Sequence, residues 1–268
     1  MIARNAWLAQ LAVSLAAGLF LIPLLLLVSS SFKSADELKS NPFAVLPSEP
    51  TLENYRQVLA ETPFRRQLKN TLLLCGGSVL GTLISCSLAA YGFARLRWLG
   101  NKLLFALLIA TMLLPWQVTM IPRFLLIREL GGHDTLASLI LPTFFGEAFY
   151  IFLLRQFMLT IPEDISEAGR IDGLSEWGIY WHLVLPLSAP ALVAITIFQC
   201  VAAWNDFGGP MLYLSDPQKF PLAYGLEQFV SSYADQTHLL LAATVLFALP
   251  IVCLVFLLQR SVSSASYR

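Results

Sequence analysis

A charged segment able to form ion pairs and hydrogen bonds, Ile161–Gly173, lies between two long apolar segments. It opens with a proline and two acidic residues at 162–164, an order that suits the first turn of a helix. Asp172 and Gly173 supply a stop, since glycine adopts the left-handed conformation of a helix cap. We therefore predict a short polar helix, followed by a second amphipathic stretch at 175–183, that faces an aqueous partner.

A second group of polar side chains lies in or just after an apolar run. Thr196, Gln199 and Asp206 fall near one face of a helix, and Asn205 precedes Asp206. A shared polar face suits a water-filled path through a membrane. Hydrogen bonding between helices, with Trp204 as an interfacial anchor, explains the pattern equally well, so both interpretations stay open.

Glu147 is the only acidic residue deep within a predicted span. A carboxylate in lipid is costly unless it is paired, hydrated or neutral, so we expect Glu147 to face inward. It would line a path or pair with a partner, or it would pair with a neighbouring polar side chain. A misplaced helix boundary is the third explanation.

Motifs for catalysis and cofactor binding are missing from the sequence. There is no phosphate-binding Gly-x-x-x-x-Gly-Lys-Ser/Thr, no Gly-x-Ser-x-Gly and no His-Glu-x-x-His. Cys75 and Cys86 would lie roughly 16 Å apart along one helix, too far for a disulfide. No metal-ligand spacing links the four cysteines to the histidines. We predict no catalytic residue, metal or cofactor on this chain.

The composition is that of an integral membrane protein. Hydrophobic residues make up 57% and charged residues 13% of the chain, and the mean hydropathy is +0.68. Soluble domains are less apolar and carry about 25% charged residues. Backbone in lipid must be helix or closed barrel, and the unbroken apolar runs lack the alternation of barrel strands. The zero net charge argues against a nucleic-acid partner.

The apolar runs predict an all-α protein with six transmembrane helices in a single domain, 1–268, and a loop at 158–182 outside the bilayer. We read the first run as a retained helix, because it is longer than a typical signal sequence. The helices are expected near 8–30, 71–93, 103–122, 136–157, 183–204 and 239–259.

Small residues recur every four positions on the second expected helix, at Gly77, Gly81, Ser85 and Ala89. Such a ridge lets helix backbones approach closely in lipid. We expect it to pack within the chain, with a partner subunit as the alternative.

The charged loop resembles the EAA loop of importer-type ABC transporter permeases. Glu167-Ala168, Asp172-Gly173 and Leu185-Pro186 match that pattern, while Gly169 replaces its second alanine. Further similarity to the sugar-permease branch, as in maltose and glycerol-3-phosphate uptake, lies in Asn54-Tyr55, Trp204-Asn205 and Phe220–Gly225. Relatives often end in a Gly-rich basic tail, whereas this sequence ends Ser261–Arg268.

The resemblance implies a type I importer permease with a cytoplasmic coupling helix. Its expected partners are an ATPase dimer that binds ATP and Mg, a second six-helix permease, and an extracytoplasmic binding protein that delivers a carbohydrate. Glu167, Ala168, Gly169, Asp172 and Gly173 would couple to the ATPase, and the polar residues Glu147, Thr196, Gln199, Asn205 and Asp206 would border the path.

The resemblance also places the protein in the bacterial inner membrane with both termini cytoplasmic. Lys and Arg are nearly balanced between the two faces, although the short loop with Arg95, Arg97 and Lys102 favours the same orientation. Two other classes remain as alternatives. A secondary transporter or channel would work without an ATPase, and a membrane enzyme or scaffold would carry no flux.

Overall fold

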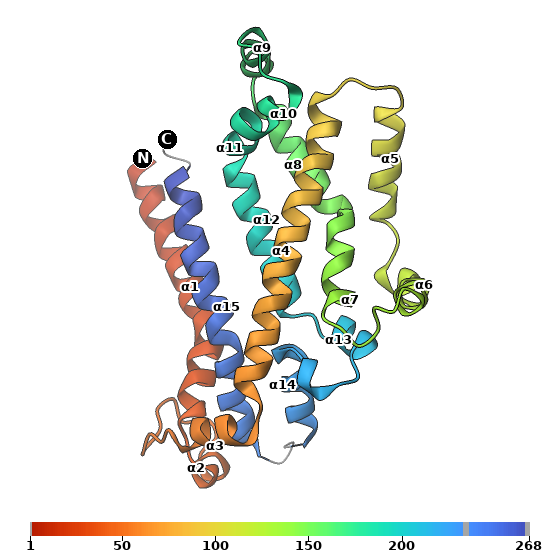
Figure 1. Cartoon of the computed structure of the whole chain (residues 1–268). Helices are drawn as coiled ribbons and strands as arrows, with labels where there is room; N and C mark the ends of the chain where they lie inside the picture. Colours follow the sequence, from red (N-terminus) through yellow and green to blue (C-terminus); the bar gives the residue numbers. More distant parts are fainter. Residues whose placement is uncertain (1, 233–235, 266–268) are drawn as a thin grey trace. The chain divides into compact units, whose positions relative to one another are not determined.

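A computed structural model describes residues 2–232 and 236–265, with side chains described for residue 7 and for 10–257 outside the gap. All regular elements in this part of the chain are helices, which confirms the predicted fold class (Figure 1). The tail singled out in the sequence extends beyond the described residues. The contacts gather in two compact units, residues 1–64 with 225–250 and residues 65–224 with 251–268, and the single domain expected from the sequence stays a prediction.

The first unit packs around a small apolar core. Val58, Phe229, Leu239 and Ala242 are buried there, which removes their surface from water. The unit contains α1 (Ile2–Ser31), α2 (Ala35–Ser40), α3 (Glu53–Glu61), most of α14 (Leu222–Ser232) and the first half of α15 (Thr237–Ala265).

Side chains of α3 satisfy the backbone where α1 ends. The last carbonyls of a helix have no partner within it. The Asn54 side-chain amide donates to the carbonyl oxygens of Ser31 and Lys33, both at 2.8 Å. The Tyr55 hydroxyl lies 2.5 Å from the Ser31 hydroxyl. The Asn54-Tyr55 pair noted in the sequence therefore fixes α3 to the end of α1.

The second unit holds most of the remaining elements. These are α4 (Phe64–Arg95), α5 (Asn101–Thr111), α6 (Trp116–Glu129), α7 (Ala137–Ile140), η1 (Leu141–Phe145), α8 (Ala148–Thr160), α9 (Glu163–Ile171), α10 (Glu176–Ile179), η2 (Tyr180–Val184), α11 (Leu185–Leu187), α12 (Ala189–Trp204), α13 (Gly208–Tyr213) and η3 (Pro217–Lys219).

In the described part of the chain, four helical stretches are long and apolar enough to cross a membrane: Gln10–Ser31, Phe64–Arg95, Ala137–Thr160 and Thr237–Leu257. Two bent helix pairs bring the number up to six if each pair forms one span. The six predicted spans thus correspond to these six stretches.

The prediction of one continuous helix at 103–122 is wrong. It is two helices, α5 and α6, bent by 100° around the break between Thr111 and Trp116. Pro115 lacks an N–H and disfavours helical backbone at Leu114, which ends α5 before the apolar run is over. A hydropathy pattern does not reveal this break, because the residues on both sides of it are apolar.

The spans expected at 183–204 and 136–157 also differ from straight helices. The helical segment Glu176–Leu187 meets α12 at 73°, next to Ser188 and between two prolines. Gly146, with φ of 84°, separates η1 from α8. Both breaks occur at residues that interrupt regular helix hydrogen bonding or favour left-handed backbone.

The ridge of small residues on α4 packs within the chain, against α7 and η1. A Cβ on Gly77 would lie 2.9 Å from Ile140, and one on Gly81 would lie 2.3 Å from the Thr143 hydroxyl. The Ser85 hydroxyl donates to the Thr143 carbonyl at 2.9 Å. This confirms the expected packing and rules out a free ridge on the side facing η1.

We predict that Gly81→Ala destabilises the protein by about 1–3 kcal/mol, because the added methyl overpacks against Thr143 and Phe144. Gly76→Ala is the matched control, since nothing lies within 4 Å of its Cβ position on the same helix. Thermal unfolding in detergent measures both. Equal midpoints for the two variants would contradict the tight packing.

Candidate functional site

The predicted polar helix exists as α9, and it ends as the sequence indicated. Pro162 precedes it and Gly173, with φ of 86°, follows it. The Leu174 N–H donates to the Gly169 carbonyl at 2.9 Å, and the Gly173 N–H donates to the Arg170 carbonyl at 3.1 Å. These two bonds form a Schellman cap, so α9 has a sharply defined C-terminus.

One face of α9 packs against the helical segment that follows it. Ser166 and Gly169 are buried, and a Cβ on Gly169 would come within 2.7 Å of the Leu183 side chain. Glycine therefore stands in place of the expected alanine because Leu183 and Ile179 occupy the space beside it.

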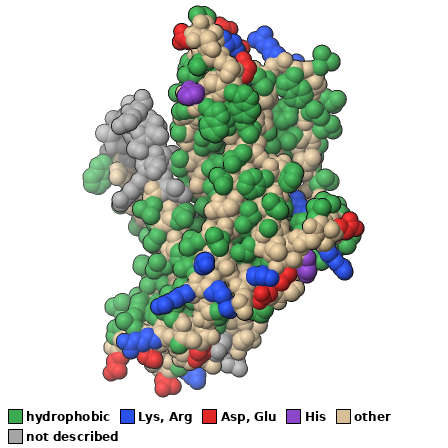
Figure 2. Space-filling view, viewed as in Figure 1, with side chains coloured by type: hydrophobic (Ala, Val, Ile, Leu, Met, Phe, Trp, Pro, Cys, Tyr) green, Lys and Arg blue, Asp and Glu red, His purple; other side chains and the backbone are tan. Residues whose placement is uncertain are grey.

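The opposite face of α9 is open. Glu167, Ala168 and Asp172 are exposed, and the Ile171 side chain is 86% exposed. Among the described residues, neither carboxylate forms an ion pair within the chain. Figure 2 shows acidic and basic side chains gathered at the α9 end, above the hydrophobic surface of the neighbouring helices. This face thus presents two carboxylates and the apolar Ile171 side chain for contact with a partner.

Arg95, the last residue of α4, holds the loop before α9 in place. Its guanidinium donates to the carbonyl oxygens of Met158 and Ile161 at 2.7 and 2.6 Å. These carbonyls belong to the end of α8 and to the residue after it, where helix partners run out. The sequence marks Arg95 only as an orientation signal, because its two partners lie 63 and 66 positions away in the chain.

A second contact joins the segment after α9 to α4. The Tyr91 hydroxyl donates to the Glu176 carboxylate at 2.7 Å, and the Arg170 guanidinium donates to the same carboxylate at 2.9 Å. Glu176 raises the pKa of Arg170, chiefly through this hydrogen bond. The Ser87 and Tyr180 hydroxyls also lie 2.8 Å apart. The α9–η2 segment is thus fixed rigidly to the span below it.

A cavity of about 1060 Å³ lies at the other end of the second unit, among α6, η1 and α13. It brings together Glu147, Asn205 and Asp206, three of the predicted path residues. Thr196 and Gln199 are not in its lining: the Thr196 hydroxyl donates to the Leu192 carbonyl of its own helix at 2.9 Å, and Gln199 is buried.

Glu147 lies inside the apolar stretch Ala137–Thr160, as expected, but at a break in its helix. Glu147 has extended backbone at the N-cap of α8, and its side chain is exposed to the cavity. The break at Gly146 displaces it from a continuous helix. A carboxylate that lines such a cavity can be hydrated, which lowers the cost of a charge within a span.

The cavity contains groups that the sequence reasoning missed. Arg123 lines it and interacts electrostatically with Glu147 and Tyr213. Trp116 lines it as well. No local pattern marked these residues, because α6 comes to the site only through the 100° bend.

Asp206 is half-buried in this cavity, and burial raises the pKa of its carboxyl group. One carboxylate oxygen accepts the Gly209 N–H at 2.9 Å, at the start of α13. The bond fixes the carboxylate relative to the helix that forms one wall.

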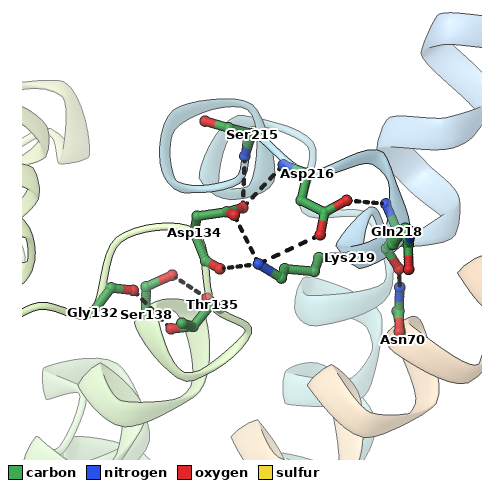
Figure 3. Close-up of polar contacts among 9 residues, drawn as sticks. All are labelled: Asn70, Gly132, Asp134, Thr135, Ser138, Ser215, Asp216, Gln218 and Lys219. Atoms are coloured by element: carbon green, nitrogen blue, oxygen red, sulfur yellow. Dashed lines mark hydrogen bonds and ion pairs between the residues drawn. The ribbon is translucent and has the colours of Figure 1, made fainter.

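A polar cluster drawn in Figure 3 holds the far end of α13. Asp134, with φ of 57°, accepts the backbone N–H groups of Ser215 and Asp216 at 2.9 and 3.0 Å. Its carboxylate also lies 2.7 Å from the Lys219 ammonium. The Asp134 N–H donates to the Tyr213 carbonyl at 2.9 Å. The cluster therefore connects the loop before α7 to the loop after α13.

Gly173→Ala should loosen α9, because an alanine at φ of 86° costs roughly 1 kcal/mol or more in left-handed backbone. Hydrogen exchange of the α9 amides measures the effect. Gly92→Ala serves as control, since nothing lies within 4 Å of its Cβ position. Unchanged exchange in the Gly173 variant would show that the cap does not stabilise the helix.

Removing the Asp134 carboxylate should speed hydrogen exchange at the amides of Ser215 and Asp216. Asp134→Ala removes the acceptor, whereas Asp134→Asn keeps an acceptor and a residue type that tolerates left-handed backbone. We expect faster exchange in the alanine variant than in the asparagine variant. Identical exchange in wild type and Asp134→Ala would contradict the role of the cluster.

Acid should weaken the same cluster. The Lys219 ammonium, together with the two backbone N–H donors, holds the pKa of Asp134 well below its usual range. Because the folded pKa is lowered, the stabilisation is complete above the ordinary carboxyl value of about 4. This stabilisation is lost only as the pH falls through the lowered pKa of Asp134. The hydrogen-exchange rates of the Ser215 amide in wild type and in Asp134→Ala should therefore become equal at that pH.

Comparison with known proteins gives the same fold. A solved structure of a bacterial ABC transporter involved in the import of the acidic polysaccharide alginate aligns with a TM-score of 0.81 at 24% identity over 96% of each chain. A second, of the alginate transporter in complex with alginate pentasaccharide-bound periplasmic protein, aligns with a TM-score of 0.66 at 15% identity, covering 95% of this chain and 93% of the other.

Sequence relatives are permeases. A putative ABC transporter permease, ORF2, of Caldicellulosiruptor is 35% identical over 86% of this chain and 84% of the relative. The arabinooligosaccharides permease AraQ of Halalkalibacterium halodurans is 30% identical over 95% and 92%. The polygalacturonan/rhamnogalacturonan permease YtcP of Bacillus subtilis is 34% identical over 78% and 72%. Residues 81–265 match the family model for binding-protein-dependent transport system inner membrane components, and the chain belongs to that family.

Proposed function

We propose that this chain is one permease half of an ATP-driven importer, and that it translocates a carbohydrate delivered by an extracytoplasmic binding protein. The observation that carries the proposal is α9, a capped helix with Glu167 and Asp172 exposed. The residues just before it are joined to α4 by Arg95. A helix fixed in this way can transmit a partner's movement to the spans.

The energy source must lie on other chains. This sequence has no phosphate-binding loop, so ATP and Mg belong to a partner ATPase dimer. We place α9 on the cytoplasmic side with both termini, in the bacterial inner membrane. Glu167, Ala168, Gly169, Asp172 and Gly173 carry the coupling contact or its geometry.

A second permease, different from this one, completes the pathway. Closure of the ATPases rocks the two halves and opens the path alternately to each side. The residues that border the path on this chain are Glu147, Asn205 and Asp206, since they share one cavity. Thr196 and Gln199 do not line this cavity. They belong to α12, whose C-terminal end positions Asn205, and would support the path residues indirectly.

The substrate class rests on the relatives. The names of the matched permeases refer to arabino-oligosaccharides and to polygalacturonan or rhamnogalacturonan, and the structural neighbours import alginate. Uncharged and acidic saccharides both occur among them. These names support an oligosaccharide as substrate and leave its charge to be inferred from the cavity.

We expect Glu167→Ala and Asp172→Ala to lower ATP-driven saccharide uptake by about tenfold or more, because each removes an exposed carboxylate from a contact that closes on a partner. Retention of the ATPase during purification should fall in parallel. Glu49→Ala, which removes an equally exposed carboxylate from the other unit, is the control.

Two results would overturn the proposal. Normal uptake and normal ATPase retention in both α9 variants would remove the coupling role. Uptake that persists after ATP depletion, with the ion gradients clamped, would instead identify a secondary transporter or channel.

A further inference from the structure

The cavity of the second unit has the size and chemistry of a ligand site. Its volume of about 1060 Å³ is at the upper end of the roughly 300–1,000 Å³ typical of small-molecule sites. A short oligosaccharide segment fits such a volume. Its lining combines polar with aromatic side chains, a composition that suits molecules with hydroxyl edges and apolar ring faces.

The charged lining is unequal in sign. Arg123 is the one cation in the described lining, and Glu147 and Asp206 are the two acids, so the formal charge is +1 − 2 = −1. Carboxylates accept short, strong hydrogen bonds from hydroxyl groups. Arg123 supplies hydrogen-bond donors and, among the described residues, forms no direct ion pair with either acid.

The aromatic wall is held in place. Trp116 is 57% exposed, and its indole ring lies 3.5 Å from the Cβ position of Gly208 at the start of α13. Tyr213 at the end of α13 also lines the cavity. Asp206 and the Asp134 cluster fix the two ends of that helix. An exposed indole on a fixed support offers a flat apolar surface for a sugar ring.

Resting on the importer function proposed above, we propose that this cavity is a saccharide-contact site on this chain that accepts uncharged oligosaccharides and disfavours uronates. Hydroxyl groups bind Glu147, Asp206 and Arg123, while a ring face packs on Trp116. The site thus adds a charge filter to the selection made by the binding protein.

The discrimination follows from electrostatics. A uronate carboxylate entering the cavity meets two like charges and one opposite charge. Like charges brought together in a partly enclosed cavity repel more strongly than they do in bulk water, and Arg123 already interacts with Glu147. An uncharged sugar avoids this repulsion and uses all three groups as hydrogen-bond partners.

The test uses the assembled importer, purified with its permease partner and ATPases but without binding protein. The probes are an uncharged pentose trisaccharide and a galacturonate trisaccharide. The site signal is the tryptophan fluorescence change that Trp116→Phe abolishes. The variants Glu147→Ala, Asp206→Ala and Arg123→Gln test the lining. The control, Glu129→Ala, removes a charge that lies on α6, as Arg123 does, but outside the cavity.

We expect the uncharged trisaccharide to give a saturable change, with Kd raised by about tenfold or more in Glu147→Ala and Asp206→Ala and unchanged in Glu129→Ala. The galacturonate should bind at least about tenfold more weakly in wild type. Tighter galacturonate binding that Arg123→Gln abolishes would overturn the charge preference.

Two further outcomes separate this inference from the proposed function. If neither probe changes the Trp116 signal while vesicles containing the importer still take up saccharide, the contact site is wrong and the importer function stands. If the vesicles take up no saccharide with binding protein and ATP present, the proposed function itself fails.

Discussion

The constraint on which this structure depends is the need to satisfy backbone polar groups wherever a membrane helix stops. Lipid offers no hydrogen bonds, and the end of each helix leaves carbonyl or amide groups without partners. Side chains distant in sequence fill these positions. Asn54 closes the end of α1, Arg95 closes the end of α8, and Asn70 donates to the carbonyls of Gln218 and Phe220 at 2.9 and 3.1 Å.

These closures also make the functional geometry. Arg95 is a cation at the end of a span, and its bonds to the 158 and 161 carbonyls join the end of α4 to the segment just before α9. Asp134 is an acceptor where Arg95 is a donor: its carboxylate accepts the backbone N–H groups of the loop after α13. The α9 loop, which we propose meets an ATPase, and the cavity that we propose binds substrate are therefore held by the same kind of interaction.

Local chemistry explains what the sequence could predict. The start and end of α9 depend on Pro162 and Gly173, which act within one turn, and the hydrophobic runs mark the spans directly. The 100° bend at Pro115 does not follow from the sequence alone, because a proline can also begin a helix or be tolerated inside one, as Pro122 is within α6. Arg123 and Trp116 reach the cavity through that bend, and Tyr91 meets Glu176 across a long sequence separation. Such pairings become visible only once the helices are packed.

The central claim is that this chain works as part of an ATP-driven assembly. Purification from its native membrane in mild detergent, followed by identification of the copurifying chains, tests it most directly. We predict recovery of an ATPase with a phosphate-binding loop, together with a second six-helix permease. Repeated recovery of this chain alone, under conditions that keep known importers intact, would contradict the account.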